Sequence, residues 1–184
     1  MSDAELRRFE EQLRRQTKRR QQMRKVLSRA VTPFLRKHKF TGSCPHFRRL
    51  GPERFDLLTF QFDKFGDGFV IELGQCLSSW SPSPGHASAS PEKLQPMYLD
   101  AHERARIQPG PFLSREDHAK ALALRCQGLP TPVCLQATAN WFRYDSAEVL
   151  DDYKRIADSV LPFLEKALEM FESFENVPKI DEAC

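Results

Sequence analysis

The stretch from Arg54 to Cys76 constrains the fold more than any other part of the chain. In RFDLLTFQFDKFGDGFVIELGQC, apolar residues recur at every second position on either side of FGDG at 65–68. Such alternation is typical of strands with one buried face, and an Asp-Gly pair tolerates the positive φ angles of a tight hairpin. The apolar faces consist of Leu58, Phe60 and Phe62 in the first run and Phe69, Ile71 and Leu73 in the second. The stretch therefore predicts an antiparallel hairpin whose apolar face another layer must cover.

Further strands are expected on both sides of this hairpin. PHFRRL at 45–50 indicates a shorter strand of the same antiparallel sheet. Residues 98–107 fit a strand or a helix, 115–127 fit a short helix, and 133–144, ending in NWFRY, indicate another strand. The predicted fold class is α+β, with an antiparallel sheet of four or five strands packed against long N- and C-terminal helices.

A long amphipathic helix is predicted from about residue 3 to 38. Its seam positions follow each other at alternating spacings of three and four, and they are Leu6, Phe9, Leu13, Gln16, Arg20, Met23, Leu27, Ala30 and Phe34. At 1.5 Å per residue such a helix is roughly 50 Å long, so part of it should project from a small domain or pack on a partner. The polar residues Gln16 and Arg20 mark where a packed half, from Met23 onward, should give way to a freer half.

A second long helical pattern follows a predicted cap at Asp145 or Ser146. Its apolar positions recur at threes and fours, and they are Val149, Tyr153, Ile156, Val160, Leu164, Ala167, Phe171 and Phe174. Pro33 and Pro162 each fall within a helical pattern and remove a backbone donor there. Each proline should therefore kink its helix or begin a new one.

Charge is divided between the two ends of the chain. Residues 1–39 hold 13 Lys and Arg against 4 Asp and Glu, a net +9, whereas residues 145–184 hold 4 against 11, a net −7. The whole chain carries only +3, which does not by itself imply a polyanionic partner. The acidic residues of the second helix include Glu165, Glu169, Glu172 and Glu175. We expect them to lie along the basic helix, within the same chain or across an antiparallel dimer.

A single domain is expected from 184 residues of which 40% are hydrophobic. We divide the chain into a basic helical extension (1–22), an α+β domain (23–176) with a mobile Ser/Pro-rich loop (78–96), and a disordered tail (177–184). The first residues are charged throughout, and no segment approaches the roughly 20 apolar residues of a membrane span. Five scattered cysteines fit reduced thiols. The protein is therefore predicted to be cytoplasmic and not membrane-bound.

Several motifs occur in an order that is known from one family. They are VTPFLRKHKF, PHFRRLG, FVIELGQ, HERARI, NWFRY and ADSVLPFLEKA. Through them, residues 23–170 resemble a bacterial family of domains of unknown function, the one numbered 4304. The matching positions are Phe40, Phe47, Arg48, Arg106, Ile107, Trp141 and Phe142. The chain departs from the family by its extra basic stretch before residue 23 and its long Ser/Pro loop. The resemblance implies the fold but no activity. An immunity-like role, in which the protein neutralises a toxin, rests on analogy with other small bacterial domains.

HERARI at 102–107 is the first candidate binding segment. If it is a strand, His102, Arg104 and Arg106 point to one side. Such an arginine pair can hold a phosphate or carboxylate through paired hydrogen bonds. Trp141 and Arg143 would suit an aromatic platform or a partner contact. The alternative for the three basic residues is a strand face that is simply solvated, and the alternative for Trp141 is an aromatic residue that closes the core.

Catalytic and metal-binding motifs are absent from the sequence. Cys44 and His46 flank Pro45, but no CxxC, no HExxH and no His pair at i, i+4 occurs. The chain also contains no phosphate-binding glycine loop and no nucleophile motif. We therefore predict no catalytic residue, no metal site and no cofactor, and an enzyme is the least supported class.

The basic run of the first helix forms a narrow stripe opposite the apolar seam. The stripe consists of Arg7, Arg14, Lys18, Lys25, Arg29 and Arg36. It can neutralise phosphates of a nucleic acid, or it is simply the solvent side of a helix. No aromatic residue lies between 10 and 33, although a base-stacking surface would need one. Glu10 and Glu11 interrupt the run, which disfavours a membrane-surface helix.

Three functional hypotheses follow. The first is a non-enzymatic interaction module, immunity-like in one version, that binds a protein partner or a second copy through its helices. The second is nucleic-acid binding through the basic N-terminal helix. The third is an enzyme or small-anion binder that uses the face of His102, Arg104 and Arg106.

Overall fold

The structure of the protein is a computed structural model that describes residues 3–64, 67–80, 90–99, 103–107 and 141–173, together with the single positions 109 and 124. The helices are α1 (Asp3–Lys37), α3 (Leu150–Asp158) and α4 (Leu161–Ser173). The strands are β1 (Thr41–Ser43), β2 (His46–Leu50), β3 (Arg54–Phe62), β4 (Gly68–Leu77), β5 (Arg104–Ile107) and β6 (Phe142–Arg143). Two 3₁₀ turns are η1 (Pro91–Lys93) and η2 (Pro96–Tyr98).

The strands form one antiparallel sheet in the order β1-β2-β3-β4-β5, and β6 pairs with the beginning of β4. The predicted hairpin is β3 and β4, in which Phe62 lies opposite Phe69. The predicted α+β class is confirmed. The described sheet has six strands, one more than the upper expectation. Strand β1 contains three residues, too few to show an alternating pattern, whereas β6 lies within the strand predicted at 133–144.

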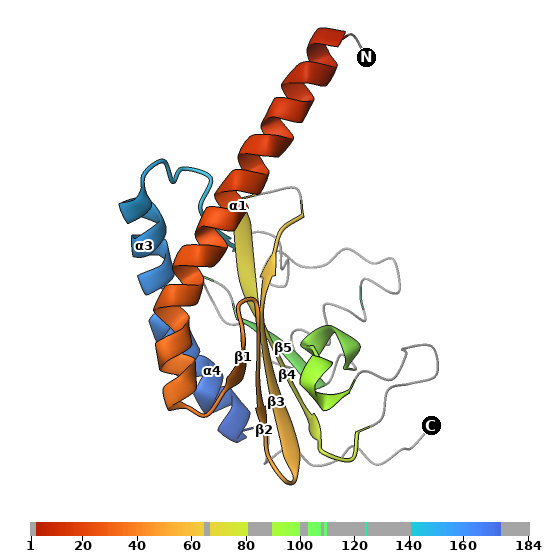
Figure 1. Ribbon diagram of the computed structural model, residues 1–184. Helices are drawn as coiled ribbons and strands as arrows, with labels where there is room; N and C mark the ends of the chain where they lie inside the picture. Colours follow the sequence, from red (N-terminus) through yellow and green to blue (C-terminus); the bar gives the residue numbers. More distant parts are fainter. Residues whose placement is uncertain are drawn as a thin grey trace.

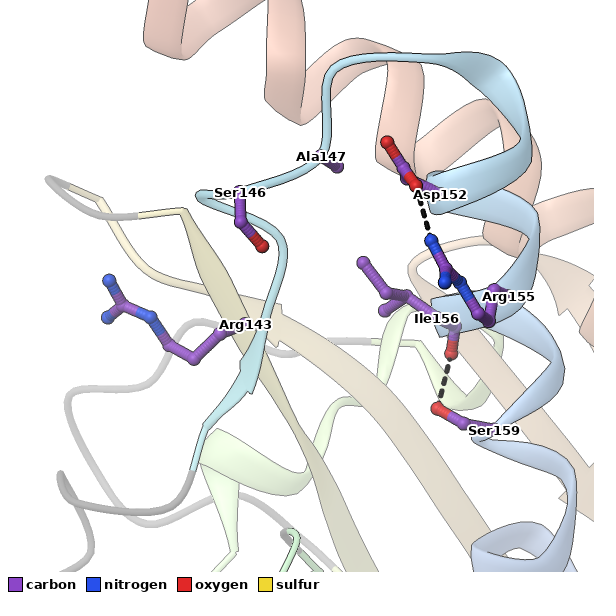
Figure 2. A pocket seen from close by; sticks show the side chains of 7 residues that line it. All are labelled: Arg143, Ser146, Ala147, Asp152, Arg155, Ile156 and Ser159. Atoms are coloured by element: carbon purple, nitrogen blue, oxygen red, sulfur yellow. Dashed lines mark hydrogen bonds and ion pairs between the residues drawn. The ribbon is translucent and has the colours of Figure 1, made fainter.

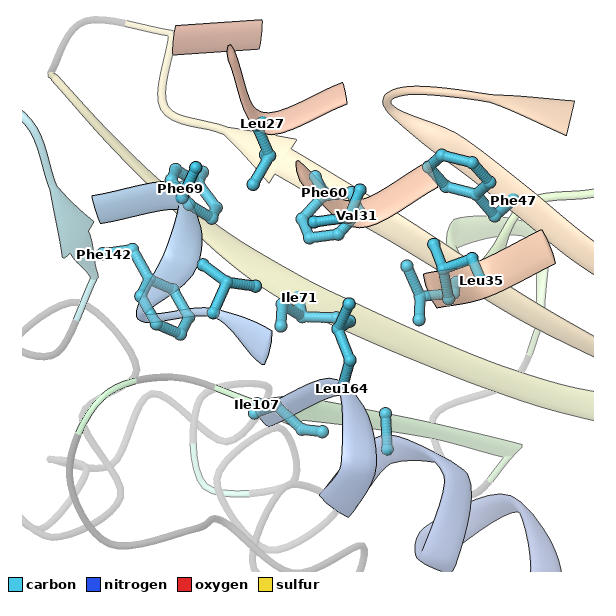
Figure 3. Close-up of a cluster of buried hydrophobic side chains, with 14 of the residues drawn as sticks. Leu27, Val31, Leu35, Phe47, Phe60, Phe69, Ile71, Ile107, Phe142 and Leu164 are labelled. Carbon is cyan, nitrogen blue, oxygen red and sulfur yellow. The ribbon is translucent and has the colours of Figure 1, made fainter. Parts of the chain in front are cut away.

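Helices cover one face of this sheet. Figure 1 shows α1, α3 and α4 on one side and the turns η1 and η2 on the other. The main core lies between the helices and the sheet, and Figure 3 shows Leu27, Val31 and Leu35 of α1 among the aromatic residues of the strands. A smaller cluster on the opposite face consists of Phe55, Leu57, Cys76, Leu94 and Leu99. Each fully buried large side chain contributes about 1.5–3 kcal/mol to stability by leaving water.

The buried side of α1 matches the predicted seam only in part. Met23 and Leu27 are buried as expected, whereas Ala30 and Phe34 are half-buried and the positions after them, Val31 and Leu35, are completely buried. The predicted seam of α1 follows a strict seven-residue repeat. A straight helix has 3.6 residues per turn, so its buried stripe drifts away from that repeat along its length.

The C-terminal helical pattern is divided into two helices. Pro162 is the second residue of α4, as expected for a proline that begins a new helix. The predicted cap at Asp145 or Ser146 is wrong, because α3 begins at Leu150. Its first turn is instead closed by the Asp152 carboxylate, which accepts hydrogen bonds from the backbone N–H groups of Glu148 and Val149 at 3.1 and 3.2 Å. Pro33 does not interrupt α1.

Helix α3 packs directly against α1, but apolar residues make the contact. Tyr153 and Ala157 of α3 belong to the same buried cluster as Met23 of α1. Among the described residues, no ion pair joins Glu165, Glu169 or Glu172 of α4 to α1, and Lys166 of α4 itself binds Glu169 at 2.7 Å. The expected charge pairing between the two helices is therefore not present in the described part of the chain.

Several predictions concern segments outside the described residues. They are the helix at 115–127, the tail at 177–184, most of the strand at 133–144 and the side chain of His102. The Ser/Pro-rich loop at 78–96 is described only at its two ends. At its second end, η1 is followed by Leu94, which is buried against the smaller cluster.

Candidate functional site

The sheet face turned away from the helices carries two rows of aligned residues. The first row runs across β2, β3, β4 and β5 through His46, Thr59, Glu72 and Arg106. The second row contains Arg48, Leu57, Gly74 and Arg104. Their sequence neighbours belong to the core under the helices, so alternation along each strand places both rows on the opposite face. We call Arg48, Thr59, Glu72, Arg104 and Arg106 the arginine face.

Glu72 is the acidic centre of the arginine face, and it is only 4% exposed. Its Oε1 accepts a hydrogen bond from Nη2 of Arg106 at 2.6 Å, and Nη2 of Arg104 lies 3.5 Å away. The same Arg106 nitrogen donates to Oε1 of Gln61 at 3.1 Å. Two guanidinium groups therefore converge on one buried carboxylate, which compensates its loss of water.

His46 ends the first row beside Thr59, with 3.1 Å between its Nδ1 and the Thr59 Oγ1. Burial lowers the pKa of His46, and the positive charges of Arg48 and Arg24 lower it further. A lowered pKa keeps the imidazole neutral near neutral pH. The face therefore holds three guanidinium charges and one carboxylate charge.

The turn η2 borders the arginine face. A Cβ at Gly74 would lie 2.7 Å from Cδ1 of Leu99 and 3.1 Å from Cα of Pro96, so only glycine permits this approach. Leu99 also packs with Leu57 in the smaller cluster. The middle of the second row is thus covered by protein, and the charged groups lie beside it.

Trp141 and Arg143 lie elsewhere along the sheet. Arg143 is opposite Gly68, four residues along β4 from Glu72 and thus roughly 13 Å away at the usual rise of a strand. A Cβ at Gly68 would lie 3.1 Å from Cβ of Trp141, so Trp141 is also at this end of the strand. The structure brings Arg104 and Arg106 together, as the sequence suggested, but does not place Trp141 and Arg143 beside them.

Arg143 instead lines a hollow of about 400 Å³ next to α3 (Figure 2). Its Nη2 donates to Oδ2 of Asp145 at 2.9 Å, which raises the pKa of Arg143 and lowers that of Asp145. On the other wall of the hollow, Arg155 pairs with Asp152 (Figure 2). Both arginines already have a carboxylate partner, so the described residues that line this hollow offer no unpaired charge to a ligand.

The first part of α1 extends past the rest of the described structure (Figure 1). We call residues 3–22 the projecting half and residues 23–37 the packed half. Leu6, Phe9 and Leu13 are 42%, 53% and 41% exposed, whereas Met23 on the same seam is completely buried. The projecting half therefore presents an apolar stripe to solvent.

Positively charged residues lie on the side of α1 opposite to that apolar stripe. All six members of the predicted basic stripe are exposed. At the far end, Arg36 donates hydrogen bonds to the carbonyls of Phe40 and Gly42 at 2.8 and 2.6 Å, so this residue has a structural role. Arg14 and Lys18 make no ion pair within the described residues. The projecting half thus combines exposed apolar groups with unpaired positive charge.

A second hollow, of about 450 Å³, lies where α1 passes the start of α3. It is lined from α1 by Arg15, Lys18, Arg19 and Gln22, and from the other side by Ala147, Glu148, Leu150 and Tyr153. Next to it, Val149 and Leu150 are among the large apolar side chains exposed on the surface. The hollow therefore connects the basic side of the projecting half, which includes Lys18, to the start of α3.

Two arginines fix α1 to the hairpin at the point where the projecting half begins to leave the domain. Arg19 Nη1 lies 2.9 Å from Oδ2 of Asp67, a nearly buried carboxylate, and Arg20 donates to the carbonyl of Lys64 at 3.2 Å. In the described part of the chain, Oδ1 of Asp67 and the hydroxyl of Tyr144 are buried and without a hydrogen-bond partner. Burial and the charge of Asp67 raise the pKa of Tyr144. Arg19 is therefore the main compensation for this buried carboxylate.

Two thiols lie within the described residues, and neither is in a disulfide. Burial raises the pKa of Cys44 to about 11 and that of Cys76 to about 12. Such thiols remain protonated near neutral pH and are weak nucleophiles. Among the described residues, no group of three or more His, Cys, Asp and Glu side chains is arranged to hold a metal ion.

The fold defines an α+β protein with an antiparallel sheet whose one face is covered by terminal helices and whose other face carries the arginine face. Within that class, the chain belongs to the family described as domain of unknown function DUF4304, whose model matches residues 31–173. Neither a curated protein nor a solved structure matched the chain. Among the described residues, no helix has the length and apolar character needed to cross a bilayer.

The family match begins inside the packed half of α1. The projecting half, its exposed stripe and its unpaired cations therefore lie outside the matched region. The arginine face lies within it.

Proposed function

We propose that this protein is a non-enzymatic interaction module of the bacterial cytoplasm that uses the projecting half of α1 to bind an acidic, amphipathic helix of another protein. The observation that carries the proposal is the exposure of Leu6, Phe9 and Leu13 on the line that is buried further along the same helix. Exposed apolar residues at helical spacing are the usual anchors for a partner helix that lies in an apolar groove.

Charge favours an acidic partner over a second copy of the chain. From residue 12 to residue 20 the helix contains five Lys and Arg and no acidic residue. Two copies in parallel would set these cations against each other, with Arg20 in the shared core. The positive charges of Arg14 and Lys18, on the opposite side of the helix, would attract an acidic helix from a distance, and a carboxylate could lie in the hollow beside Arg15.

Nucleic-acid binding is the second candidate, because every member of the basic stripe is exposed. A duplex would engage the cations and leave Leu6, Phe9 and Leu13 in water. A protein helix would cover the apolar stripe, which a duplex leaves exposed, and for this reason the protein partner ranks first. The toxin-neutralising version of the proposal is narrower, since it requires the acidic partner to be a toxin.

A site-specific photocrosslinker at position 9 tests the proposal in cells of the source organism. We expect one protein to crosslink at position 9, through a peptide from an acidic amphipathic helix, and much less crosslinking from position 14 on the opposite face. With the purified partner, L6S/F9S/L13S should weaken binding at least about 100-fold, because three apolar anchors are lost.

The matched control is R7Q/R14Q/K18Q, which removes charge from the same helix. It should weaken protein binding only about tenfold, with a steep dependence on salt. A nucleic-acid binder would give the opposite result. R7Q/R14Q/K18Q would abolish binding to a duplex, and L6S/F9S/L13S would retain it. Equal crosslinking from positions 9 and 14 would also reject the proposed surface.

A further inference from the structure

The arginine face has more positive charge than its own residues neutralise. Arg48, Arg104 and Arg106 contribute three guanidinium groups, and within the described residues Glu72 is the one carboxylate bound directly to any of them. Arg106 lies 2.6 Å from Glu72 and Arg104 lies 3.5 Å from it. The exposed carboxylate of Glu92 interacts with the charge of Arg48 only from a distance. Positive charge therefore remains in excess on this partly buried surface.

Arg48 is the clearest part of this surplus. Its side chain is half-buried, and no hydrogen bond or ion pair of its guanidinium group occurs in the described structure. A partly buried guanidinium group normally has several acceptors, because it has five N–H donors and loses water on burial. Among the described residues, Arg48 therefore has hydrogen-bond donors available for a ligand, and the exposed Glu92 interacts with it only through its charge.

The positions of these arginines converge on one floor. Across β2 and β3, Arg48 is the diagonal neighbour of Thr59, and across β4 and β5, Arg104 is the diagonal neighbour of Glu72. Thr59 and Glu72 are directly opposite each other and are 7% and 4% exposed. Diagonal neighbours in a sheet lie about 7–8 Å apart, within reach of long side chains.

The three guanidinium groups are partly buried. In the described structure, the Nε atoms of Arg48, Arg104 and Arg106 are buried without a hydrogen-bond partner. Arg104 and Arg106 are 22% and 16% exposed and are held by Glu72. Side chains that are already held in this way lose less conformational entropy when an anion binds to them.

We propose that the arginine face is a binding site for a phosphate group, which would lie over Thr59 and Glu72 between Arg48 on one side and Arg104 with Arg106 on the other. A phosphate dianion carries two negative charges, and its oxygens accept hydrogen bonds from several directions. A single carboxylate matches less well, because it carries one charge and Glu72 already supplies a carboxylate at this place. The site does not involve α1 and is independent of the proposed function.

Calorimetric titration of the full chain with inorganic phosphate, at constant ionic strength adjusted with sodium chloride, tests this site. We expect saturable binding, and acetate under the same conditions should bind at least tenfold more weakly. Arg104→Gln and Arg48→Gln should each weaken phosphate binding about tenfold, the usual effect of losing one charge-assisted hydrogen bond. Arg106 is left intact because its removal would leave Glu72 buried and unpaired.

Arg143→Gln is the matched control, since it removes one guanidinium group at the far end of β4. It should leave phosphate binding unchanged. Arg48→Gln breaks no described pairing, so its melting temperature should equal that of the unaltered protein, and lost binding in that variant cannot be ascribed to unfolding. The proposal is overturned if phosphate binding is not saturable, if either site variant keeps its affinity, or if Arg143→Gln loses as much as they do.

Discussion

Helix α1 contains two halves that share one amphipathic pattern and differ in what lies against them. In the packed half, Met23, Leu27 and Val31 are completely buried between the sheet and the C-terminal helices. In the projecting half, the equivalent residues Leu6 and Phe9 are about half-exposed. The pattern of the sequence is the same in both, so the pattern alone does not decide burial.

The lengths of the elements explain the difference. Helix α1 contains 35 residues and is therefore about 52 Å long, whereas the longest strand, β4, contains 10 residues and spans about 33 Å. The sheet ends before the helix does. A helix beyond the end of its sheet keeps its hydrogen bonds but gains no packing, and isolated helices of this length are only marginally stable in water.

Truncation of one leucine in each half should give the largest contrast. Leu27→Ala leaves a cavity in the core and should lower the free energy of unfolding by about 2–5 kcal/mol. Leu13→Ala removes a side chain that is 41% exposed and should change it by less than about 0.5 kcal/mol. Urea denaturation of both variants measures the contrast. A loss of several kcal/mol in Leu13→Ala would mean that the projecting half is packed after all.

The contact between Arg19 and Asp67 marks the boundary of the two halves, and its removal should have the next largest effect. Arg19→Gln leaves the Asp67 carboxylate nearly buried without its cation and should cost about 1–3 kcal/mol. It should also accelerate amide hydrogen exchange in residues 10–22, because this contact holds the helix on the hairpin.

Arg15→Gln is the control for that variant. Arg15 pairs only with Glu11 among the described residues, one turn away on the helix surface, and both side chains are more than 60% exposed. An exposed pair of this kind contributes less than about 0.5 kcal/mol. If both variants lowered stability equally, Arg19 would not be the anchor that separates the two halves.

Most of the sheet could be predicted from the sequence because its strands are long enough to show their alternation. Phe60 and Ile71 stand in runs of regular spacing, and the Asp-Gly pair between the runs identifies the hairpin. The short strand β1 carries no such signal and forms because neighbouring backbone groups offer hydrogen bonds, whereas β6 lies within the segment 133–144 that the sequence predicts to be a strand. Likewise, the break between α3 and α4 was indicated by Pro162, whereas the start of α3 depends on Asp152, which sequence analysis did not identify as a capping residue.

The arginine face could be predicted only in part. Arg104 and Arg106 were recognised because they alternate along one short segment. Arg48 and Glu72 come from other strands, and the register that aligns them is a tertiary property. A signal was nevertheless present: Glu72 interrupts the apolar run FVIEL, and a buried carboxylate at such a place requires a cation opposite it. Trp141 and Arg143 stand at the end of a predicted strand. The sequence does not show where in the sheet this strand end lies, so it did not indicate that both residues are distant from Glu72.

The smallest expected effect concerns how strongly the charges of each half of α1 change the pKa of His46. Burial lowers the pKa of His46 most, followed by the positive charges of Arg48 and of Arg24, which belongs to the packed half of α1. The folded protein therefore binds fewer protons at His46 than the unfolded chain does. The free energy of unfolding should fall as the pH drops below 6.5, which is the ordinary pKa of histidine. This fall should end once the pH is below the lowered pKa of the folded state.

Arg24→Gln should raise the pKa of His46 toward its ordinary value and narrow the pH range over which stability is lost, as measured by NMR titration of the imidazole and by denaturation at several pH values. Lys18→Gln removes the same charge from the projecting half and should leave both unchanged, because exposed charges beyond about 10 Å are screened by salt. An equal shift in the two variants would show that the projecting half lies against the sheet, which would remove the distinction between the halves of α1.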